Sequence, residues 1–227
     1  MLIGGFQKFS LIDYPNKTCA IIFTVGCNFR CPYCYNKKLV LENEFPTPIP
    51  FDEIKAFLQK RVGLLDAVEF TGGEPLLHKD IPFYIKEIKE MGFLVKLDTN
   101  GTIPYKLSEI ISSVDYIAMD IKAPLSKYTL ATGVDIDTNK IKDSIQLIRK
   151  YAKDYEFRTT FIKNFINTES DLYEIGELIK GSPRYFIQRP LLSSVLNPKF
   201  PFQIHSDEEL KYYKQLMEKF VKKVEIR

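Results

Sequence analysis

The sequence contains no apolar run long enough to cross a membrane. A bilayer-spanning helix needs about 20 consecutive apolar residues, whereas the longest apolar segment, residues 19–25, has the length of a strand. The amino terminus lacks a basic segment followed by a long apolar stretch, so we expect no secretory signal. These absences predict a cytoplasmic protein with no membrane partner.

Cysteine is absent outside one short segment, since all four cysteines lie within residues 19–34. A disulfide framework would distribute its cysteines over several loops, whereas a cluster in a cytoplasmic protein indicates metal or redox chemistry.

The sequence also has no large excess of charged residues of one sign. The net charge is +3, from 32 basic and 29 acidic residues, without a long basic run. We therefore expect no nucleic-acid partner.

No linker rich in Pro, Gly or Ser and no sequence repeat divides the chain, so we predict one domain over residues 1–227. We expect an irregular segment over residues 1–18 and a C-terminal helix at about residues 206–222. Between them, β-rich segments alternate with amphipathic ones. Strands are predicted at residues 19–25, 68–71, 94–98, 116–120, 156–162 and 185–188, with a further short edge strand at 224–226. Other helices are predicted at residues 51–62, 81–91, 107–111, 140–151 and 172–179.

Six strand–helix units predict an α/β fold with an open parallel sheet and outer helices. Six units are too few to close the usual eight-stranded barrel, so we expect a partial, TIM-like (β/α)6 barrel. In such folds ligands bind beyond the carboxyl ends of the strands. Unusual residues follow four of the predicted strands: Cys27; Gly72, Gly73 and Glu74; Asp98 and Thr99; Asp120 and Lys122.

The cysteine motif places Cys27, Cys31 and Cys34 on one loop after the first predicted strand. Thiolates select zinc or iron–sulfur clusters. A cubane cluster usually takes four cysteines, so three would leave one iron open to a substrate. The alternative is a closed zinc site with Cys19 as fourth ligand, as in a zinc-stabilised binding module.

The motif resembles the Cys-x3-Cys-x-aromatic-Cys signature of the radical S-adenosylmethionine enzymes, with Tyr33 as the aromatic residue. Thr71-Gly-Gly-Glu-Pro75, after the next predicted strand, strengthens the resemblance. It implies a 4Fe–4S cluster on Cys27, Cys31 and Cys34. It also implies that S-adenosylmethionine binds the open iron and is cleaved by an electron from the cluster, which yields a 5′-deoxyadenosyl radical.

The resemblance also implies roles for other residues. Gly72, Gly73 and Glu74 would receive the methionine ammonium group, although a plain Gly-Gly turn is the alternative. Asp98, Thr99 and Asp120 would bind a monovalent cation beside the methionine carboxylate, and Lys122 would contact that carboxylate. For single aspartates a surface ion pair or a turn is the alternative.

Three further residues are candidate contacts of S-adenosylmethionine: Asn36, Arg158 and Gln188. A salt bridge is the alternative for Arg158, since a buried charge needs a partner, and a loop cap is the alternative for Asn36. His78 and His205 show no metal-ligand spacing, so we expect neither to be catalytic.

The segment from Gly4 to Pro15 resembles the one that precedes the cluster in activating proteins of anaerobic ribonucleoside-triphosphate reductase. Two residues depart from the pattern of these activators: Tyr35 stands where they often carry His after the third cysteine, and Asn16 stands where Gly often follows Tyr-Pro. The resemblance implies a partner glycyl-radical enzyme, the large reductase subunit, from which a glycine hydrogen is abstracted. It implies a flavodoxin- or ferredoxin-type electron donor. The alternative within the family is a radical enzyme acting on a small molecule, similar to a deazapurine synthase.

Overall fold

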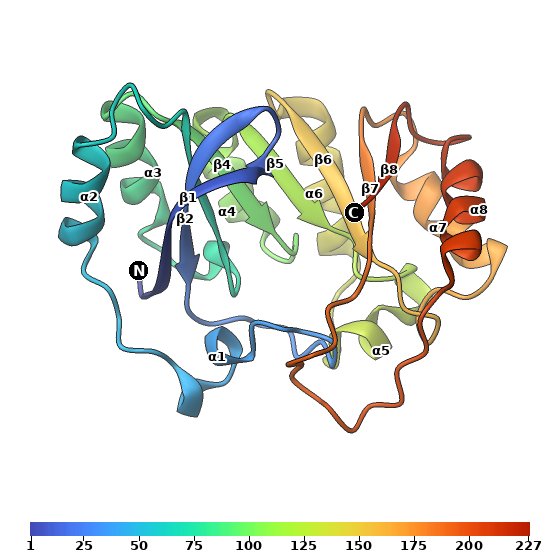
Figure 1. The fold of residues 1–227 in the computed structure, drawn as a ribbon. Helices are drawn as coiled ribbons and strands as arrows, with labels where there is room; N and C mark the ends of the chain where they lie inside the picture. The colour runs from blue at the N-terminus through green and yellow to red at the C-terminus, as the bar shows by residue number, and fades with distance from the viewer.

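The centre of the structure is one eight-stranded sheet whose strands follow each other in chain order. The structure is a computed structural model and describes residues 1–227. The strands are β1 (Ile3–Tyr14), β2 (Lys17–Thr24), β3 (Ala67–Gly72), β4 (Leu94–Thr99), β5 (Tyr116–Asp120), β6 (Tyr155–Thr160), β7 (Tyr185–Gln188) and β8 (Val224–Ile226). Strands β2 to β8 run parallel, and β1 pairs antiparallel with β2. Since β1 and β8 are its edges, the curved sheet is open between them (Figure 1).

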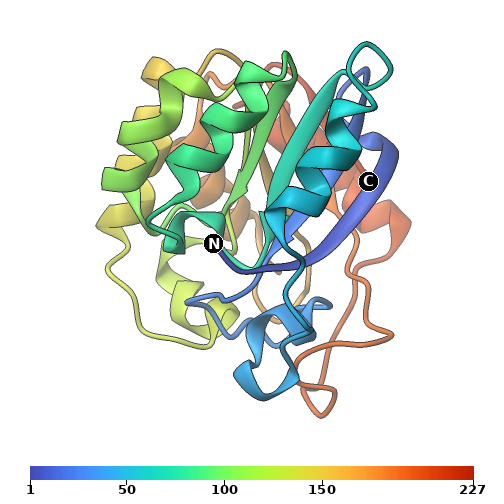
Figure 2. The same ribbon diagram turned by 90° about the vertical axis from the view of Figure 1, so that its left-hand side faces the viewer.

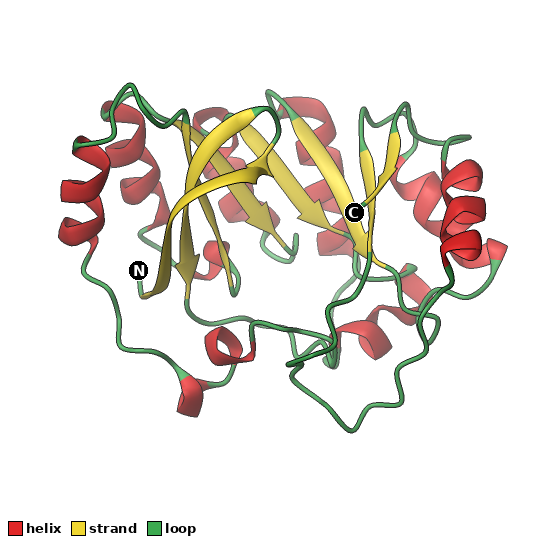
Figure 3. Cartoon of the chain, viewed as in Figure 1, coloured by secondary structure: helices red, strands yellow, loops and turns green.

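Helices cover the outer, convex face of this sheet (Figures 2 and 3). They are α2 (Phe51–Gln59), α3 (Ile81–Glu90), α4 (Pro104–Ile110), α6 (Asn139–Tyr151), α7 (Glu169–Ile179) and α8 (Asp207–Met217). Two short helices, α1 (Lys37–Val40) and α5 (Tyr128–Thr132), lie with the loops beyond the carboxyl ends of the strands (Figure 1). None of these helices combines the length and the apolar character needed to cross a bilayer.

The helices pack on the sheet through apolar faces with helical spacing. In α6 the buried residues include Ile141, Ile145 and Ile148, which join a core cluster of 48 residues. Both α7 and α8 begin at capping boxes, formed by Thr168 with Asp171 and by Ser206 with Glu209. Reciprocal bonds of this kind satisfy backbone donors that a helix start leaves free.

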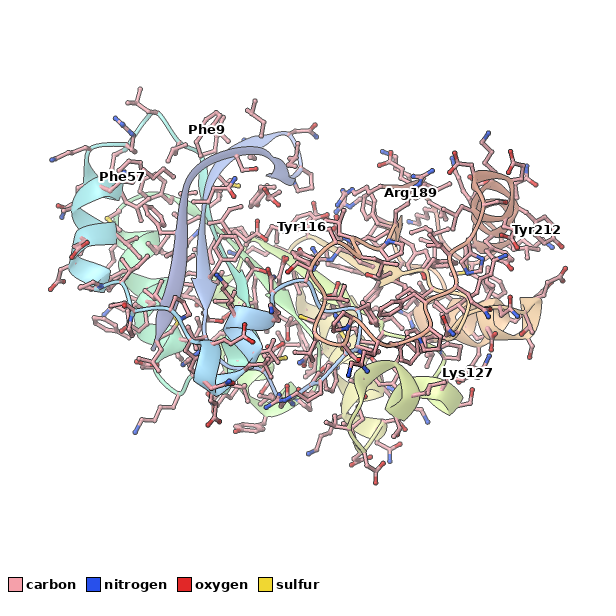
Figure 4. All side chains as sticks on the ribbon, turned by 60° about the horizontal axis from the view of Figure 1, so that its bottom comes forward. Phe9, Phe57, Tyr116, Lys127, Arg189 and Tyr212 are labelled. Atoms are coloured by element: carbon pink, nitrogen blue, oxygen red, sulfur yellow. The ribbon has the colours of Figure 1, made fainter.

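A second, smaller cluster fills the inside of the curved sheet near the start of the strands. It consists of Tyr14, Cys19, Ile21, Ala67, Tyr116 and Ala118. The rings of Tyr14 and Tyr116 lie 5.4 Å apart between centroids, and Figure 4 shows Tyr116 near the middle of the molecule. This plug leaves the opposite, carboxyl end of the sheet for a ligand.

The structure confirms the predicted α/β fold, with β2 to β7 as the six predicted strands and β8 at the predicted edge. The prediction of an irregular segment over residues 1–18 was wrong, because residues 3–14 form β1. As an edge strand, β1 pairs through its backbone while most of its side chains are partly or fully exposed, so it lacks an apolar pattern. The C-terminal helix ends at Met217 instead of residue 222, because tight turns follow it.

Candidate active site

A cavity of about 560 Å³ lies at the carboxyl ends of the parallel strands. Every residue for which a cofactor or metal role was predicted lines it: Cys27, Cys31, Tyr33, Cys34, Asn36, Gly72, Gly73, Glu74, Asp98, Thr99, Asp120, Lys122, Arg158 and Gln188. These residues lie in the carboxyl-terminal half of six different strands or follow them. The topology therefore brings them together, as expected for a parallel α/β sheet.

The cysteine loop forms one wall of the cavity. Cys31 is 6% exposed, while Cys27 and Cys34 are half-buried, and all four cysteines of the chain are free. Burial raises the pKa of Cys27 to about 11 and that of Cys31 to about 12, and it also raises the pKa of Cys34. These thiols are therefore protonated at neutral pH and become ligands only when a metal displaces their protons.

Backbone hydrogen bonds hold this loop in place. Cys34 N donates to Cys31 O at 3.0 Å, and Phe29 N donates to Cys27 Sγ at 3.4 Å. From the segment between β7 and α8, Leu196 N donates to Cys34 O at 2.9 Å and Asn197 N to Pro32 O at 3.0 Å. The cysteines are thus tethered to a distant part of the chain that the sequence did not indicate.

Gly72, the last residue of β3, and Gly73, which follows it, pack directly against the backbone before Cys27. A Cβ atom on Gly73 would lie 1.9 Å from Gly26 O, and one on Gly72 would lie 2.6 Å from Thr24 N. Gly73 N donates to Thr24 O at 2.9 Å. Only glycine permits this approach, so the half-buried Gly72–Gly73 edge is set next to the cysteine loop.

Glu74 is 1% exposed, and its carboxylate is engaged within the protein. Oε2 accepts from Asn100 N at 2.6 Å, and Oε1 accepts from Thr99 Oγ1 at 2.8 Å and Leu76 N at 3.1 Å. Burial raises the pKa of Glu74 to about 7, although these donors oppose the rise. The carboxylate holds the end of β4 against the turn after β3, so an ammonium group would meet the backbone edge before this side chain.

A chain of alternating charges crosses the inside of the sheet. Lys96, 2% exposed, contacts Glu69 Oε1 at 2.9 Å and Asp98 Oδ1 at 2.8 Å. Arg158 contacts Asp98 Oδ2 at 3.0 Å and Asp120 Oδ1 at 2.8 Å. The chain ends where Lys122 contacts Asp120 Oδ2 at 2.9 Å. The network therefore joins three acidic side chains to three basic ones, and burial together with the neighbouring Asp98 raises the pKa of Glu69.

This network bears on four predicted roles. Arg158 forms the salt bridges that were its alternative. Burial alone would raise the pKa of Asp98, but Arg158 and Lys96 hold it below its usual range. Asp98 and Asp120 each contact two cationic side chains of the chain, so a bound cation would have to share these carboxylates with them. Lys122 reaches the cavity as one member of an ion pair.

The remaining candidates differ in how they are held. The Tyr33 hydroxyl is buried without a hydrogen-bond partner, and its ring centroid lies 5.7 Å from that of Phe165. Asn36 precedes α1 but its side chain makes no capping hydrogen bond. Neither histidine lines the cavity: His78 Nε2 lies 2.9 Å from Val25 O, and His205 contacts a different backbone carbonyl.

Cys19 is separated from the other cysteines by the length of β2. It is 0% exposed inside the small cluster at the start of the strands and pairs in register with Ala67. Five residue steps along the strand separate it from Thr24, about 16 Å at 3.3 Å per residue. The alternative of a closed zinc site with Cys19 as fourth ligand was therefore wrong.

Two groups of residues support the site although the sequence assigned no role to them. Asn100 Nδ2 donates to Asn28 Oδ1 at 2.9 Å, and Asn28 Nδ2 donates to Thr102 Oγ1 at 2.8 Å, which ties the cysteine loop to the end of β4. Glu69 and Lys96 were also missed. The signal for Lys96 was its spacing of two residues from Asp98, which puts both side chains on one face of a strand.

Comparisons with known proteins agree with this geometry. The family model of the Radical SAM superfamily matches residues 21–179. A protein of Methanocaldococcus jannaschii is 35% identical to this chain, over all of this chain and 95% of its own length. It is named "Putative glycyl-radical enzyme activating enzyme". The 7-carboxy-7-deazaguanine synthase of Thermoplasma acidophilum is 30% identical over 67% of this chain and 70% of its own length.

A solved structure shares the fold. A domain of pyruvate-formate lyase-activating enzyme from Bacteroides vulgatus superposes with a TM-score of 0.59, over 71% of this chain and 99% of that one, at 19% identity. The fold is an α/β fold with a parallel sheet, and its three-cysteine loop offers thiols that could ligate a cofactor. The chain belongs to the radical S-adenosylmethionine superfamily, and it is an enzyme of this kind with relatives among glycyl-radical enzyme activating enzymes.

The superfamily implies a 4Fe–4S cluster and S-adenosylmethionine as cofactors. The residues present fit such a group. Three thiols on one loop provide the donor set that iron–sulfur clusters prefer, and they border a cavity large enough for a ligand beside them. The unpartnered Tyr33 hydroxyl lies in that wall. No group of three or more His, Cys, Asp or Glu side chains is arranged so that it could hold a single metal ion.

Proposed function

We propose that this protein activates a glycyl-radical enzyme, the large subunit of anaerobic ribonucleoside-triphosphate reductase. When bound, a reduced 4Fe–4S cluster supplies the electron that splits S-adenosylmethionine into methionine and a 5′-deoxyadenosyl radical. Such a radical would take one hydrogen atom from a glycine of the partner and would leave 5′-deoxyadenosine and a glycyl radical. The observation that supports this most directly is the 35% identity to a glycyl-radical enzyme activating enzyme over the whole chain.

Cys27, Cys31 and Cys34 would hold the cluster, and their common loop supports this assignment. They would leave one iron without a protein ligand, where the amino and carboxylate groups of S-adenosylmethionine bind. The half-buried Gly72–Gly73 edge adjoins that loop and offers backbone carbonyl oxygens to an ammonium group.

Lys122, which also lines the cavity, would contact the methionine carboxylate, because a compact ammonium group suits a carboxylate. Arg158 would position Lys122 through Asp120, which contacts both side chains. Asp98 would support this arrangement through its own contact with Arg158. Asn36, Tyr33 and Gln188 would line the part of the cavity that receives the remainder of S-adenosylmethionine. We do not include a monovalent cation in the proposal, because cationic side chains already contact both carboxylates of that predicted site.

The electron donor in this proposal is a flavodoxin- or ferredoxin-type protein. The compartment is the cytoplasm, where four free cysteines stay reduced. One domain over residues 1–227 would carry the whole reaction, since all the proposed residues border one cavity.

A second candidate is a radical enzyme acting on a small molecule. It is favoured by the 30% identity to a 7-carboxy-7-deazaguanine synthase over two thirds of this chain. In that case the substrate would itself fill the cavity, and no partner protein would be required.

The experiment is anaerobic incubation of the reconstituted, reduced protein with S-adenosylmethionine and the purified reductase large subunit. We expect a glycyl-radical signal by electron paramagnetic resonance and one 5′-deoxyadenosine formed for each radical. The matched control is a reductase variant whose radical-site glycine is replaced by alanine, which should give no such signal. Formation of 5′-deoxyadenosine without any glycyl radical, together with conversion of a small molecule, would favour the second candidate.

A further inference from the structure

A ring of three hydrogen-bonded side chains joins the cysteine loop to the end of β4. Asn28 Nδ2 donates to Thr102 Oγ1 at 2.8 Å, and Thr102 Oγ1 donates to Asn100 Oδ1 at 2.6 Å. Asn100 Nδ2 closes the ring by donating to Asn28 Oδ1 at 2.9 Å. Asn28 follows Cys27 in the loop, whereas Asn100 directly follows β4. Because each side chain both donates and accepts, the ring holds the loop in one position relative to β4.

The ring and the backbone together fix which way the amide of Asn100 faces. Thr102 N donates to Asn100 Oδ1 at 3.0 Å. A backbone N–H group can only donate, so this side of the amide must be its oxygen, and the NH2 group lies on the other side. There Asn100 Nδ2 has two acceptors, Asn28 Oδ1 and, at 4.0 Å, Cys27 Sγ. The two hydrogens of this amide therefore have one acceptor each.

Asn100 is held so that its amide stays directed at Cys27. It is 5% exposed, and its backbone N donates to Glu74 Oε2 at 2.6 Å. Cys27 Sγ also accepts from Phe29 N at 3.4 Å, a donor within its own loop. Asn100 therefore adds a second N–H donor to this sulfur, and this donor comes from a different part of the sheet.

An N–H donor on a cysteine sulfur affects a bound cluster through charge. A thiolate that ligates iron carries negative charge, so it accepts a hydrogen bond more strongly than a thiol does. One-electron reduction of a cluster adds negative charge, part of which lies on the ligating sulfurs. A donor directed at such a sulfur therefore stabilises the reduced form more than the oxidised form, which raises the reduction potential. Burial of the donor strengthens this effect, because water screens it little.

We infer that Asn100 is a positioning residue that holds an N–H group against Cys27 Sγ and thereby raises the reduction potential of the cluster bound by the three cysteines. The inference goes beyond the proposed function, although it rests on the cluster assigned there. An electron donor reduces the wild-type cluster more readily than a cluster that lacks this amide. The residues around the ligands, and not only the ligands, set how easily the cluster takes up its electron.

The test is a redox titration of the full-length, anaerobically reconstituted protein with dithionite, followed by electron paramagnetic resonance of the reduced cluster. Asn100→Ala removes the donor, and Asn100→Leu removes it while nearly filling the same space. In both variants the ratio of reduced to oxidised cluster at a given potential should fall at least about threefold, since part of a charge-assisted hydrogen bond is lost. For one electron, a threefold change lowers the midpoint potential by about 28 mV.

Thr102→Val is the matched control. It removes both side-chain bonds of Thr102 in the ring but keeps the backbone N–H group that orients Asn100. The ratio of reduced to oxidised cluster should stay within about 1.5-fold of the wild type, because the donor to the sulfur remains. Unchanged potentials in both Asn100 variants would overturn the inference. A shift in Thr102→Val as large as theirs would also overturn it, since the ring and not the donor would then be responsible.

A measurement on the wild type keeps the inference testable if the Asn100 variants fail to fold or to bind iron. The protein is labelled with the heavy nitrogen isotope only in the side-chain amides of asparagine. Pulsed electron paramagnetic resonance of the reduced cluster should then show a labelled nitrogen coupled to it. Absence of this coupling would overturn the inference.

Failure of the proposed function is recognised separately. If the wild type shows no cluster signal that responds to S-adenosylmethionine, the proposed function itself fails. If that response is present and the Asn100 variants keep the wild-type potential, only the role of Asn100 is refuted.

Discussion

Arg158 Nη1 donates to Asp98 Oδ2 at 3.0 Å, and this bond connects β6 to β4 past the intervening strand β5. The same guanidinium donates to Asp120 at the end of β5. One side chain thus holds three strand ends in a fixed relation at the floor of the cavity. Lys122, which follows β5, takes its position from this arrangement through its contact with Asp120.

Replacing Arg158 by methionine should destabilise the protein strongly. Asp98 would keep Lys96 and Asp120 would keep Lys122, but each would lose its guanidinium partner while it stayed buried. Breaking a buried pair in this way costs about 3–5 kcal/mol. The free energy of unfolding, measured in urea, reports this loss. Arg149→Met is the control, since Arg149 is exposed on α6, and it should change stability by less than about 0.5 kcal/mol. Equal stability of both variants would show that the charge chain is not structural.

Glu74 should make the stability of the protein depend on pH in a defined direction. Its pKa in the folded protein is about 7, against 4.5 for the free group. Between these values the folded state binds more protons than the unfolded state, so the unfolding free energy falls as pH rises. The shift corresponds to about 3 kcal/mol over that window. Below pH 4.5 the full contribution is present.

The measurement compares wild type with Glu74→Gln between pH 4 and pH 8 (about the range that brackets both pKa values). The stability of the variant should no longer fall as pH rises. The variant should also be less stable at neutral pH, because the NH2 group of its amide would face the N–H donor of Asn100. Identical pH profiles for the two proteins would contradict the burial assigned to Glu74.

Gly73→Ala should disturb the site while Gly63→Ala should not. The new methyl carbon on Gly73 would lie 1.9 Å from Gly26 O, so the backbone beside Cys27 must move. We expect a loss of about 3 kcal/mol in stability, at the upper end for overpacking, and less iron bound per chain after reconstitution. Gly63 has a positive φ of 77° but open space around it. Alanine there should lower stability by about 1 kcal/mol through backbone strain and should leave the iron content unchanged. Equal iron content in both variants would count against the close packing.

The expected effect of replacing a cysteine depends on where that cysteine lies. Cys27→Ala, Cys31→Ala and Cys34→Ala should each abolish cleavage of S-adenosylmethionine, since each removes a ligand. Cys19→Ala should retain iron and cleavage, because Cys19 lies in the plug at the other end of β2. Iron content and 5′-deoxyadenosine formation are the readouts. Full activity of Cys31→Ala would defeat the cluster assignment, and loss of the cluster in Cys19→Ala would require a fourth cysteine ligand.

Much of the fold could be predicted because its strands are buried and its helices are amphipathic. The strand at residues 116–120 was predicted with the bounds that the structure shows, since both of its faces are covered. Strand β1 could not be found in this way, because an edge strand is stabilised by backbone pairing that leaves no side-chain pattern. Helices α1 and α5 are too short for a helical periodicity to be visible.

The site could be assembled from sequence because parallel strands end at one edge of the sheet. Position alone, however, did not show which polar atoms are free. The family resemblance implied that Asp98 and Asp120 bind a cation. In the structure Asp98 contacts Lys96 of its own strand, and the register of the sheet places Arg158 opposite Asp120. The contribution of Leu196 and Asn197 to the cysteine loop depends on a long loop without any local signal.

The central claim is that three cysteines hold a cluster with an iron open to S-adenosylmethionine. The most direct measurement is electron paramagnetic resonance of the anaerobically reconstituted, reduced protein, recorded with and without S-adenosylmethionine. The account predicts a cluster signal whose spectrum changes when S-adenosylmethionine is added. A protein that binds zinc instead and gives no cluster signal after careful reconstitution would contradict it.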